Sequence, residues 1–286
     1  MKNHPLISFF LTTFLITWGI AGLFFLFPTQ VVRLTMKEAD AYHPLFRIAA
    51  SAPTLSAFLV ILLVRGKQGL LAFRARYLDF VRLRWYIIFF GGIIGFGLAL
   101  RYLEISLGAT VPTPSFSWYS FIPFAIYWVM FDPGPFGEEG GWRGFALPLM
   151  QRRFSPFWAS VILGTLWSVW HLPAFYISTL SQSNFLFPLF LMYNIALAIC
   201  MTYAYNATRG NVPLMIVIHW AINLPYFLVA RDGFFFVAFS ILYLVAAFLL
   251  SRWRRATPIT EPLPGWTQSA DAKLDNTPRI FSFGDV

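Results

Sequence analysis

The chain has very little cysteine, because Cys200 is the single one among its 286 residues and lies in an apolar stretch. A disulfide within the chain and a cluster of cysteine metal ligands are therefore excluded. We expect Cys200 to serve packing alone.

Charged residues are also scarce. They make up 12% of the chain, whereas 58% of the residues are hydrophobic and 20% are aromatic, with 33 phenylalanines. A water-soluble domain cannot cover so much apolar surface with so few polar groups. The composition predicts an integral multi-pass membrane protein, and we expect it in the cell (plasma) membrane.

Apolar runs long enough to cross about 30 Å of hydrocarbon predict an all-α, polytopic transmembrane bundle of about eight helices. The first run lacks a small-residue cleavage site, so we expect it to stay as a helix. The predicted spans are residues 5–27, 46–64, 85–103, 118–136, 156–177, 185–206, 213–229 and 233–250.

No internal repeat is visible, and the runs suggest four consecutive regions. Residues 1–115 hold the N-terminal helices and a basic loop, 116–230 hold the polar motifs described below, and 231–255 hold the last helix. The remainder, 256–286, is rich in proline and polar residues, which predicts a flexible cytosolic tail.

Acidic residues are outnumbered by basic ones, 12 to 21, which gives a net charge of +9. Most of the basic residues fall in segment 65–84 and in every second loop after it if the helices alternate in direction. Both termini are then predicted to be cytosolic. Topology explains the charge. We expect membrane lipids as partners and do not expect nucleic acid.

Two adjacent carboxylates, Glu138 and Glu139, interrupt the apolar sequence in the motif Phe136-Gly-Glu-Glu-Gly-Gly-Trp-Arg-Gly144. An ionised side chain at the bilayer centre costs about 2.5–3.5 kcal/mol even on insertion scales. Glu139 and Arg143 share a helical face, and Glu138 is rotated by about 100°. The motif is either a structural ion-pair cluster or a site in which Arg143 neutralises Glu139 and leaves Glu138 as a general base.

A second polar position is His171, which follows Trp167 by one helical turn and precedes Pro173. Proline removes a backbone donor and favours a kink, which opens space for a water-filled cavity. The alternatives for His171 are a catalytic role and a structural hydrogen bond.

His219 and Asn223 form the third polar pair, again four residues apart and therefore on one face of a helix. An interhelical hydrogen bond, worth roughly 0.6 kcal/mol on average, would account for one of them. Two polar side chains on one face favour a binding site.

The spacing also predicts depth. The Pro133–Gly137 stretch should break the fourth span, and a second helical stretch should then run to about Gln151. Glu138 precedes the turn at Arg152 and Arg153, and His171 follows it. Both should therefore lie at a similar depth, roughly 20–27 Å from that turn. His219 is much nearer to its own turn, around Asn211. Either its helix tilts or begins deeper in the membrane, or the site lies nearer the cytosol.

In combination, Glu138-Glu139-x-x-x-Arg143, Trp167-x-x-x-His171 and His219-x-x-x-Asn223 resemble the motifs of the CPBP, or Abi, family of intramembrane endopeptidases, which includes type II CAAX prenyl endopeptidases. The resemblance covers about residues 120–230. One departure is Trp167, where the family commonly has phenylalanine.

The resemblance implies an eight-helix protease that cuts a peptide bond of a membrane-associated or lipidated substrate, including prenylated CAAX proteins. By the same resemblance, Glu138 and His171 would activate water, His219 and Asn223 would stabilise the oxyanion, and Glu139, Arg143 and Trp167 would support them. A carboxylate with an imidazole, and donors on another helix, suit these roles.

Three other interpretations stay open. Glu138, His171 and His219 form a ligand set for catalytic zinc, although we favour a mechanism without a cofactor. A transporter would also place such groups in a polar cavity, but the chain shows no matching halves. A non-catalytic membrane binding or immunity protein is the third alternative.

Overall fold

The computed structural model describes residues 3–37, 43–110, 119, 123, 126–127, 132–224, 233–253 and 257–266. Throughout these ranges the regular structure is helical, and no strand occurs, which confirms the all-α prediction. The α-helices are α1 (Pro5–Leu26), α2 (Pro28–Thr35), α3 (Pro44–Ala75), α4 (Leu83–Tyr86), α5 (Gly92–Ser106), α7 (Pro133–Glu139), α8 (Leu147–Met150), α9 (Pro156–Trp170), α10 (Phe187–Ala207), α11 (Val212–Asn223) and α12 (Gly233–Trp253).

Five of the eight expected spans are helices long and apolar enough to cross a membrane. They are Pro5–Leu26, Pro44–Leu78, Leu83–Ser106, Phe187–Ala207 and Gly233–Arg252. The spans expected at 156–177 and 213–229 contain the shorter helices α9 and α11, and most of the span expected at 118–136 lies outside the described residues.

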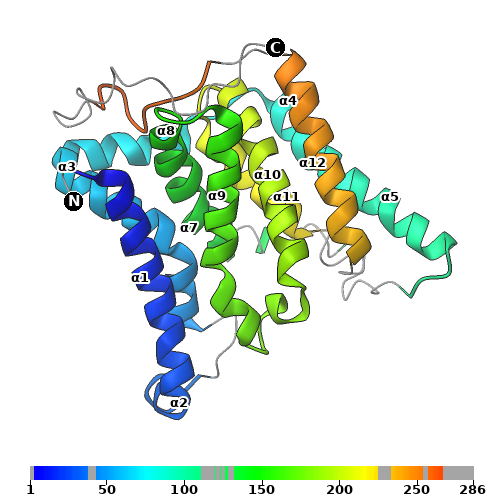
Figure 1. The fold of residues 1–286 in the computed structure, drawn as a ribbon, viewed down its shortest axis with the longest axis horizontal. Coiled ribbons are helices and arrows are strands. Elements are labelled where there is room, and N and C mark those ends of the chain that lie inside the picture. Colours follow the sequence, from blue (N-terminus) through cyan, green and yellow to red (C-terminus); the bar gives the residue numbers. More distant parts are fainter. Residues whose placement is uncertain are drawn as a thin grey trace.

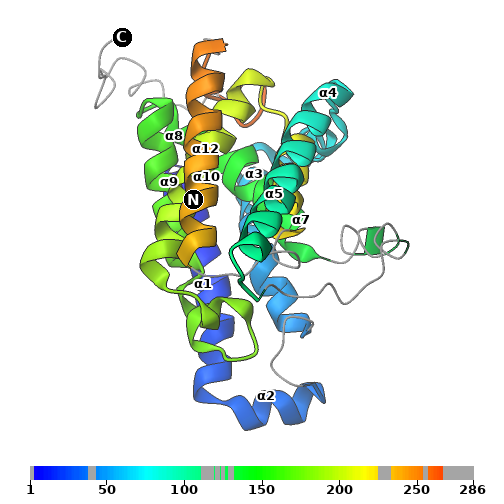
Figure 2. The ribbon, with the colours of Figure 1, turned by 90° about the vertical axis from the view of Figure 1, so that its right-hand side faces the viewer.

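The helices form a bundle with the polar motifs at its centre. Figure 1 shows α9, α10 and α11 in the middle, with α1 and α3 on one side and α5 and α12 on the other. Helix α10 packs against both α9 and α12, and α3 packs against α1 and α7. The view in Figure 2 shows the same pairing of α10 with α12.

Three of the central helices begin at a short polar residue with proline in the first two helical positions. The side chains of Asp132, Ser155 and Asn211 accept hydrogen bonds from the backbone N–H groups of Gly134 (3.0 Å), Trp158 (3.4 Å) and Leu214 (2.9 Å). Such caps provide acceptors for backbone N–H groups that have no partner within the helix. Proline lacks a backbone N–H, but at the start of a helix that N–H would have no intrahelical acceptor, so no hydrogen bond is lost. Local sequence therefore sets where α7, α9 and α11 start.

The polar motifs depart from regular α-helix. A π-helical segment, Gly140–Ala146, joins α7 to α8, and the whole stretch ends at Met150, close to the predicted Gln151. Helix α9 ends at Trp170 instead of kinking and continuing to 177, and a 3-10 turn, Leu172–Tyr176, follows it. Pro173 lacks the N–H that a continued α-helix would need.

Two glycines let α3 approach the Glu-Glu motif closely. A Cβ on Gly137 would lie 2.6 Å from the Cα of Ser51, and a Cβ on Gly141 would lie 2.3 Å from the carbonyl carbon of Pro53. Any side chain at these positions would collide with backbone. Glycine therefore allows the helix-to-helix distance on which the site depends.

Helix α11 begins inside the bundle. Asn211 is buried, and so are the first residues of the helix, Val212, Pro213 and Leu214. The start of α11 is therefore covered by neighbouring parts of the bundle.

The segment 257–266 corrects an expectation, because it is packed and does not extend freely. Trp266 is fully buried and stacks edge to face on Phe145, and Leu263 is also buried. Arg76 donates to the carbonyl oxygen of Pro262 (2.6 Å), and Arg152 donates to that of Trp266 (2.6 Å). The prolines there indicated an absence of helix, but apolar burial and arginine contacts fix this part of the tail.

Candidate active site

The four residues singled out in the sequence line one cavity of about 450 Å³. Glu138 comes from α7, His171 follows the end of α9, and His219 and Asn223 come from α11. Asp132 and Trp167 line the same cavity. The helical bundle thus brings together polar groups that are up to 91 positions apart in the sequence.

Glu138 is held by an indole group. Its side chain is buried, and Oε2 accepts a hydrogen bond of 2.6 Å from Nε1 of Trp167. A charge-assisted hydrogen bond of this kind favours the ionised carboxylate in surroundings that otherwise disfavour charge. Trp167 was expected to contribute aromatic character, and its role as a donor to Glu138 was missed.

The orientation of His171 follows from its contact with the same tryptophan. Nδ1 of His171 lies 2.8 Å from the carbonyl oxygen of Trp167. Because a carbonyl oxygen only accepts, Nδ1 carries the proton, and in a neutral ring the lone pair is then on Nε2. Trp167 therefore places a carboxylate and an imidazole with a free acceptor nitrogen on the wall of one cavity.

Glu139 and Arg143 form the predicted i,i+4 ion pair. Nη1 of Arg143 lies 2.9 Å from Oε1 of Glu139, and both side chains are fully buried. The guanidinium also lies over the ring of Trp167, with Cζ 4.3 Å from the ring centroid. Arg143 thus ties Glu139 and the tryptophan together beneath the cavity.

His219 joins this pair from another helix. Nδ1 of His219 lies 2.7 Å from Oε1 of Glu139, the same oxygen that accepts from Arg143. A carboxylate accepts, so this contact holds a proton on Nδ1. The sequence indicated that His219 shares a face with Asn223, but it did not indicate the contact with Glu139.

Asn223 is oriented by a residue that the sequence interpretation left out. Its Nδ2 donates to Oδ2 of Asp132 at 3.3 Å, while the other oxygen of Asp132 caps α7. The signal was present in the sequence, since an aspartate followed by proline is typical of a helix start. The sequence interpretation assigned no role to Asp132.

The described residues do not fit a zinc site. Glu138, His171 and His219 all line the cavity, but nowhere in the described part of the chain do three His, Cys, Asp or Glu side chains converge to hold a metal ion. We derive no chemical step through a metal.

Comparison with known proteins finds similarity over the region that holds these residues. Residues 117–225 match the family model described as type II CAAX prenyl endopeptidase Rce1-like. CAAX prenyl protease 2 of Methanococcus maripaludis is 32% identical over 120 residues.

The match to the archaeal protein covers 40% of this chain and 44% of that protein, so it spans less than half of either. The matched family region contains every residue of the cavity wall that carries a proposed chemical role, from Asp132 to Asn223. This region is thus similar to the Rce1-like type II CAAX prenyl endopeptidase family.

Proposed function

We propose that the protein is an intramembrane endopeptidase that hydrolyses a peptide bond with a water molecule activated by Glu138 and His171. The observation that carries this proposal is the convergence of Glu138, His171, His219 and Asn223 on one cavity inside an apolar bundle. Buried polar groups in such a bundle are costly and mark functional sites.

In the first step, the water oxygen attacks the carbonyl carbon of the scissile bond, and its proton passes to the carboxylate of Glu138. Nε2 of His171 accepts the second hydrogen of the water and orients it, because Nδ1 is bound to the carbonyl oxygen of Trp167. The C–N bond then breaks, and the leaving amine takes the proton from Glu138.

The negative charge that develops on the carbonyl oxygen requires hydrogen-bond donors. Nδ2 of Asn223 and a protonated Nε2 of His219 supply them, since both residues project from one face of α11. Donors fixed before the reaction lower the barrier without having to reorganise. Glu139 stabilises the protonated form of His219 through Nδ1, and Arg143 holds Glu139 in place.

The substrate we propose is a membrane-associated or lipidated peptide segment, and membrane lipids surround the protein. The names of the family and of the archaeal relative make prenylated CAAX proteins one candidate class. The five apolar spans support insertion in a membrane, for which we propose the plasma membrane.

Peptide cleavage by the purified protein in liposomes tests the proposal, with Glu138→Gln beside the wild type. The substitution keeps volume and the acceptor for Trp167 but removes the base, so turnover should be lost while the protein stays folded. Glu261→Gln makes the same chemical change on the partly exposed segment away from the cavity and should leave turnover intact.

A zinc chelator adds a second comparison. Turnover that survives the chelator and is lost in Glu138→Gln supports activation of water by the carboxylate. Turnover that the chelator abolishes and zinc restores would overturn the metal-independent mechanism. A folded protein without turnover on any lipidated or unlipidated peptide would favour the non-catalytic binding protein.

A further inference from the structure

We propose that Asn194 on α10 binds a main-chain peptide group of the substrate next to the scissile bond. The inference deepens the proposed function and rests on it, because it names a further substrate contact in the same cavity. Three observations carry it: the unpaired amide of Asn194, its place beside the site, and the hydrogen bonds that a peptide needs inside an apolar bundle.

Asn194 combines a free hydrogen-bond donor with a place in the cavity wall. The residue lines the cavity, is 2% exposed, and its Nδ2 has no hydrogen-bond partner among the described residues. Other buried side chains in the described ranges also have polar atoms without a partner, including those of Glu139, Trp142 and Thr202. Within these ranges, Asn194 is the one member of this group that lines the cavity.

A second asparagine on the same helix shows what a structural role requires. Asn206, near the end of α10, is buried and pairs with the carboxamide of Gln151 through two hydrogen bonds of 3.1 and 2.7 Å. Nδ2 of Asn194 has no comparable partner. A buried polar group that stays unpaired lowers the stability of the fold, so its presence needs an explanation other than packing. A ligand in the cavity provides one.

Helix α10 places Asn194 one turn from a residue that packs on His171. Phe190 precedes Asn194 by four residues and lines the cavity, and its ring centroid lies 5.3 Å from that of His171. Residues four positions apart share one helical face and are separated by about 6 Å along the axis. Asn194 therefore continues the same wall of the cavity.

Close packing of α10 on α9 fixes this position. A Cβ on Gly164 of α9 would lie 3.0 Å from the carbonyl oxygen of Asn194 and 2.8 Å from Cα of Ile195, so the two backbones meet there. Gly164 lies about one turn before Trp167, which donates to Glu138. Asn194 thus lies beside the part of α9 from which the proposed base is oriented.

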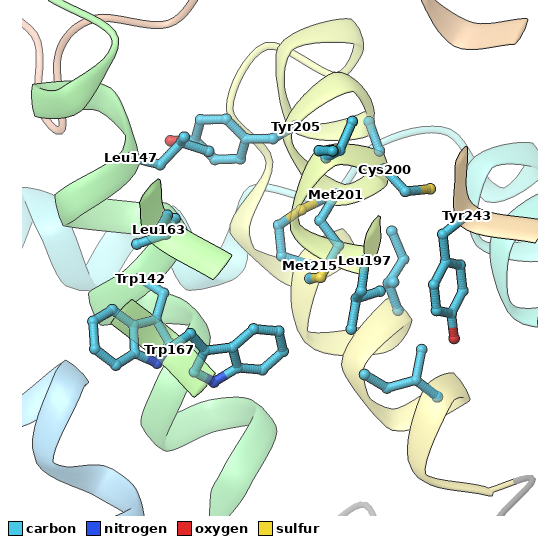
Figure 3. Packing of buried hydrophobic residues seen from close by; sticks show 14 of the residues in the cluster. Trp142, Leu147, Leu163, Trp167, Leu197, Cys200, Met201, Tyr205, Met215 and Tyr243 are labelled. Atoms are coloured by element: carbon cyan, nitrogen blue, oxygen red, sulfur yellow. The ribbon is translucent and has the colours of Figure 1, made fainter. Parts of the chain in front are cut away.

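Asn194 is also the last residue of α10 that lines the cavity. Figure 3 shows part of the core beyond it, with Leu197 and Met201 of α10 and Met215 of α11 among its members. These side chains are fully buried and apolar, so they offer no acceptor to an amide. The terminal torsion of asparagine is broad, which allows the carboxamide to turn its N–H groups toward a molecule in the cavity.

The chemistry of a bound peptide matches this free amide. A peptide in the cavity brings main-chain N–H and C=O groups out of water, and each of them needs a partner there. In the proposed mechanism Glu138, His171, His219 and Asn223 serve the water and the scissile carbonyl, so the adjacent peptide groups need other partners. A carboxamide has N–H donors and an oxygen acceptor in one plane, as a peptide group has, so the two can form paired hydrogen bonds. The hydrocarbon chain of a lipid has no such group.

Peptide affinity with and without the amide tests the proposal. The full-length Glu138→Gln protein in detergent serves as the background, and the anisotropy of a fluorescent peptide that the wild type cleaves reports binding. Adding Asn194→Leu removes the amide at similar volume. We expect the dissociation constant to rise about fivefold or more, because a buried peptide group loses its partner.

Thr202→Val is the matched control on the same helix. It removes a buried hydroxyl that also has no partner among the described residues but does not line the cavity, so the dissociation constant should not change. Asn194→Ala is a second variant without the amide and should show the same loss of affinity as Asn194→Leu.

Peptides with one main-chain amide replaced by an ester locate the contact. An ester lacks the N–H, and its carbonyl oxygen is a weaker acceptor. One ester next to the cleaved bond should weaken binding to Glu138→Gln, and the same ester should have no further effect when Asn194→Leu is present.

Melting temperatures separate binding from folding. Asn194→Leu should keep or raise the melting temperature, because no hydrogen bond within the described residues is lost at Nδ2. Asn206→Leu should lower it, because Gln151 loses its partner. A loss of stability in Asn194→Leu as large as that in Asn206→Leu would assign Asn194 a structural role and overturn the proposal.

Equal affinities with and without the amide, or an ester effect that persists in Asn194→Leu, would also overturn it. Failure of the proposed function has a different signature, namely cleavage of the peptide by Glu138→Gln. A peptide that binds to no variant would overturn both.

Discussion

Nδ1 of His219 lies 2.7 Å from Oε1 of Glu139, which joins α11 to α7 beneath the cavity. Arg143 donates to the same oxygen, so one carboxylate group orients both a cation and an imidazole. Oε2 of Glu139 and Nε and Nη2 of Arg143 have no hydrogen-bond partner among the described residues. A buried network that is only partly satisfied is difficult to explain by stability alone, and this favours a role in the reaction.

Breaking this network from one side should destabilise the protein. Glu139→Gln leaves Arg143 buried without its counter-charge, which typically costs about 3–5 kcal/mol. We expect a lower melting temperature in detergent and loss of peptide cleavage. In the double variant Glu139→Gln/Arg143→Met, stability should recover relative to the single variant while activity stays lost. A single variant as stable as the wild type would contradict a buried ion pair.

Trp167→Phe should weaken catalysis without abolishing it. The substitution removes the indole N–H that binds Glu138 but keeps an aromatic ring and the backbone carbonyl that orients His171. A hydrogen bond to a charged group is worth about 1.5–3 kcal/mol, so a loss of about tenfold or more in kcat is expected.

Trp170→Phe is the matched control for this comparison. Its indole N–H binds Thr17 and not Glu138, so cleavage should fall much less than in Trp167→Phe. Equal losses in the two variants would assign the effect to packing of the tryptophans. Steady-state kinetics on one peptide is sufficient for both measurements.

Asn223→Ala should lower kcat by about 10² to 10³, which is the usual effect of removing one oxyanion donor. A fully active variant would contradict the role assigned to Asn223. The measurement is kcat in liposomes at saturating peptide. Glu261→Gln, a substitution away from the cavity, is again the control and should keep the kcat of the wild type.

Asp132 has two roles: one carboxylate oxygen binds Asn223, and the other caps the start of α7. A substitution can separate these two roles. Asp132→Ser keeps a side-chain oxygen that caps a helix but loses the second oxygen, which binds Asn223. We expect kcat to fall while the melting temperature changes little. An Asp132→Ser variant with full activity would show that Asp132 serves α7 alone.

The close approach of α3 to the Glu-Glu motif makes a prediction about stability. Gly141→Ala would place a methyl group within 2.4 Å of the backbone of Pro53, and overpacking typically costs about 1–3 kcal/mol. Gly95→Ala on α5 meets nothing within 4 Å and should be neutral or stabilising. The melting temperatures of the two variants in detergent provide the comparison.

The amino-acid sequence by itself determined the class of the protein and much of its local structure. The lengths of the apolar runs predicted the all-α membrane bundle. A segment that crosses hydrocarbon must be apolar and must satisfy its own backbone hydrogen bonds, and a helix does both. The i,i+4 spacing predicted the pair of Glu139 with Arg143, because helix geometry is local. Helix starts are also local: α7, α9 and α11 begin just after Asp132, Ser155 and Asn211, and each has proline in its first two positions.

Only the tertiary structure decided which groups touch across helices. The contact of His219 with Glu139 and the donation from Trp167 to Glu138 join residues 80 and 29 positions apart, and periodicity along one helix contains no information on the rotation of its neighbour. The packing of 257–266 was also hidden, since its prolines exclude helix but do not reveal that Arg76 and Arg152 bind its carbonyl groups. The physical reason is that helix spacing is set by short-range sterics, whereas interhelical contacts depend on the packing of the whole bundle.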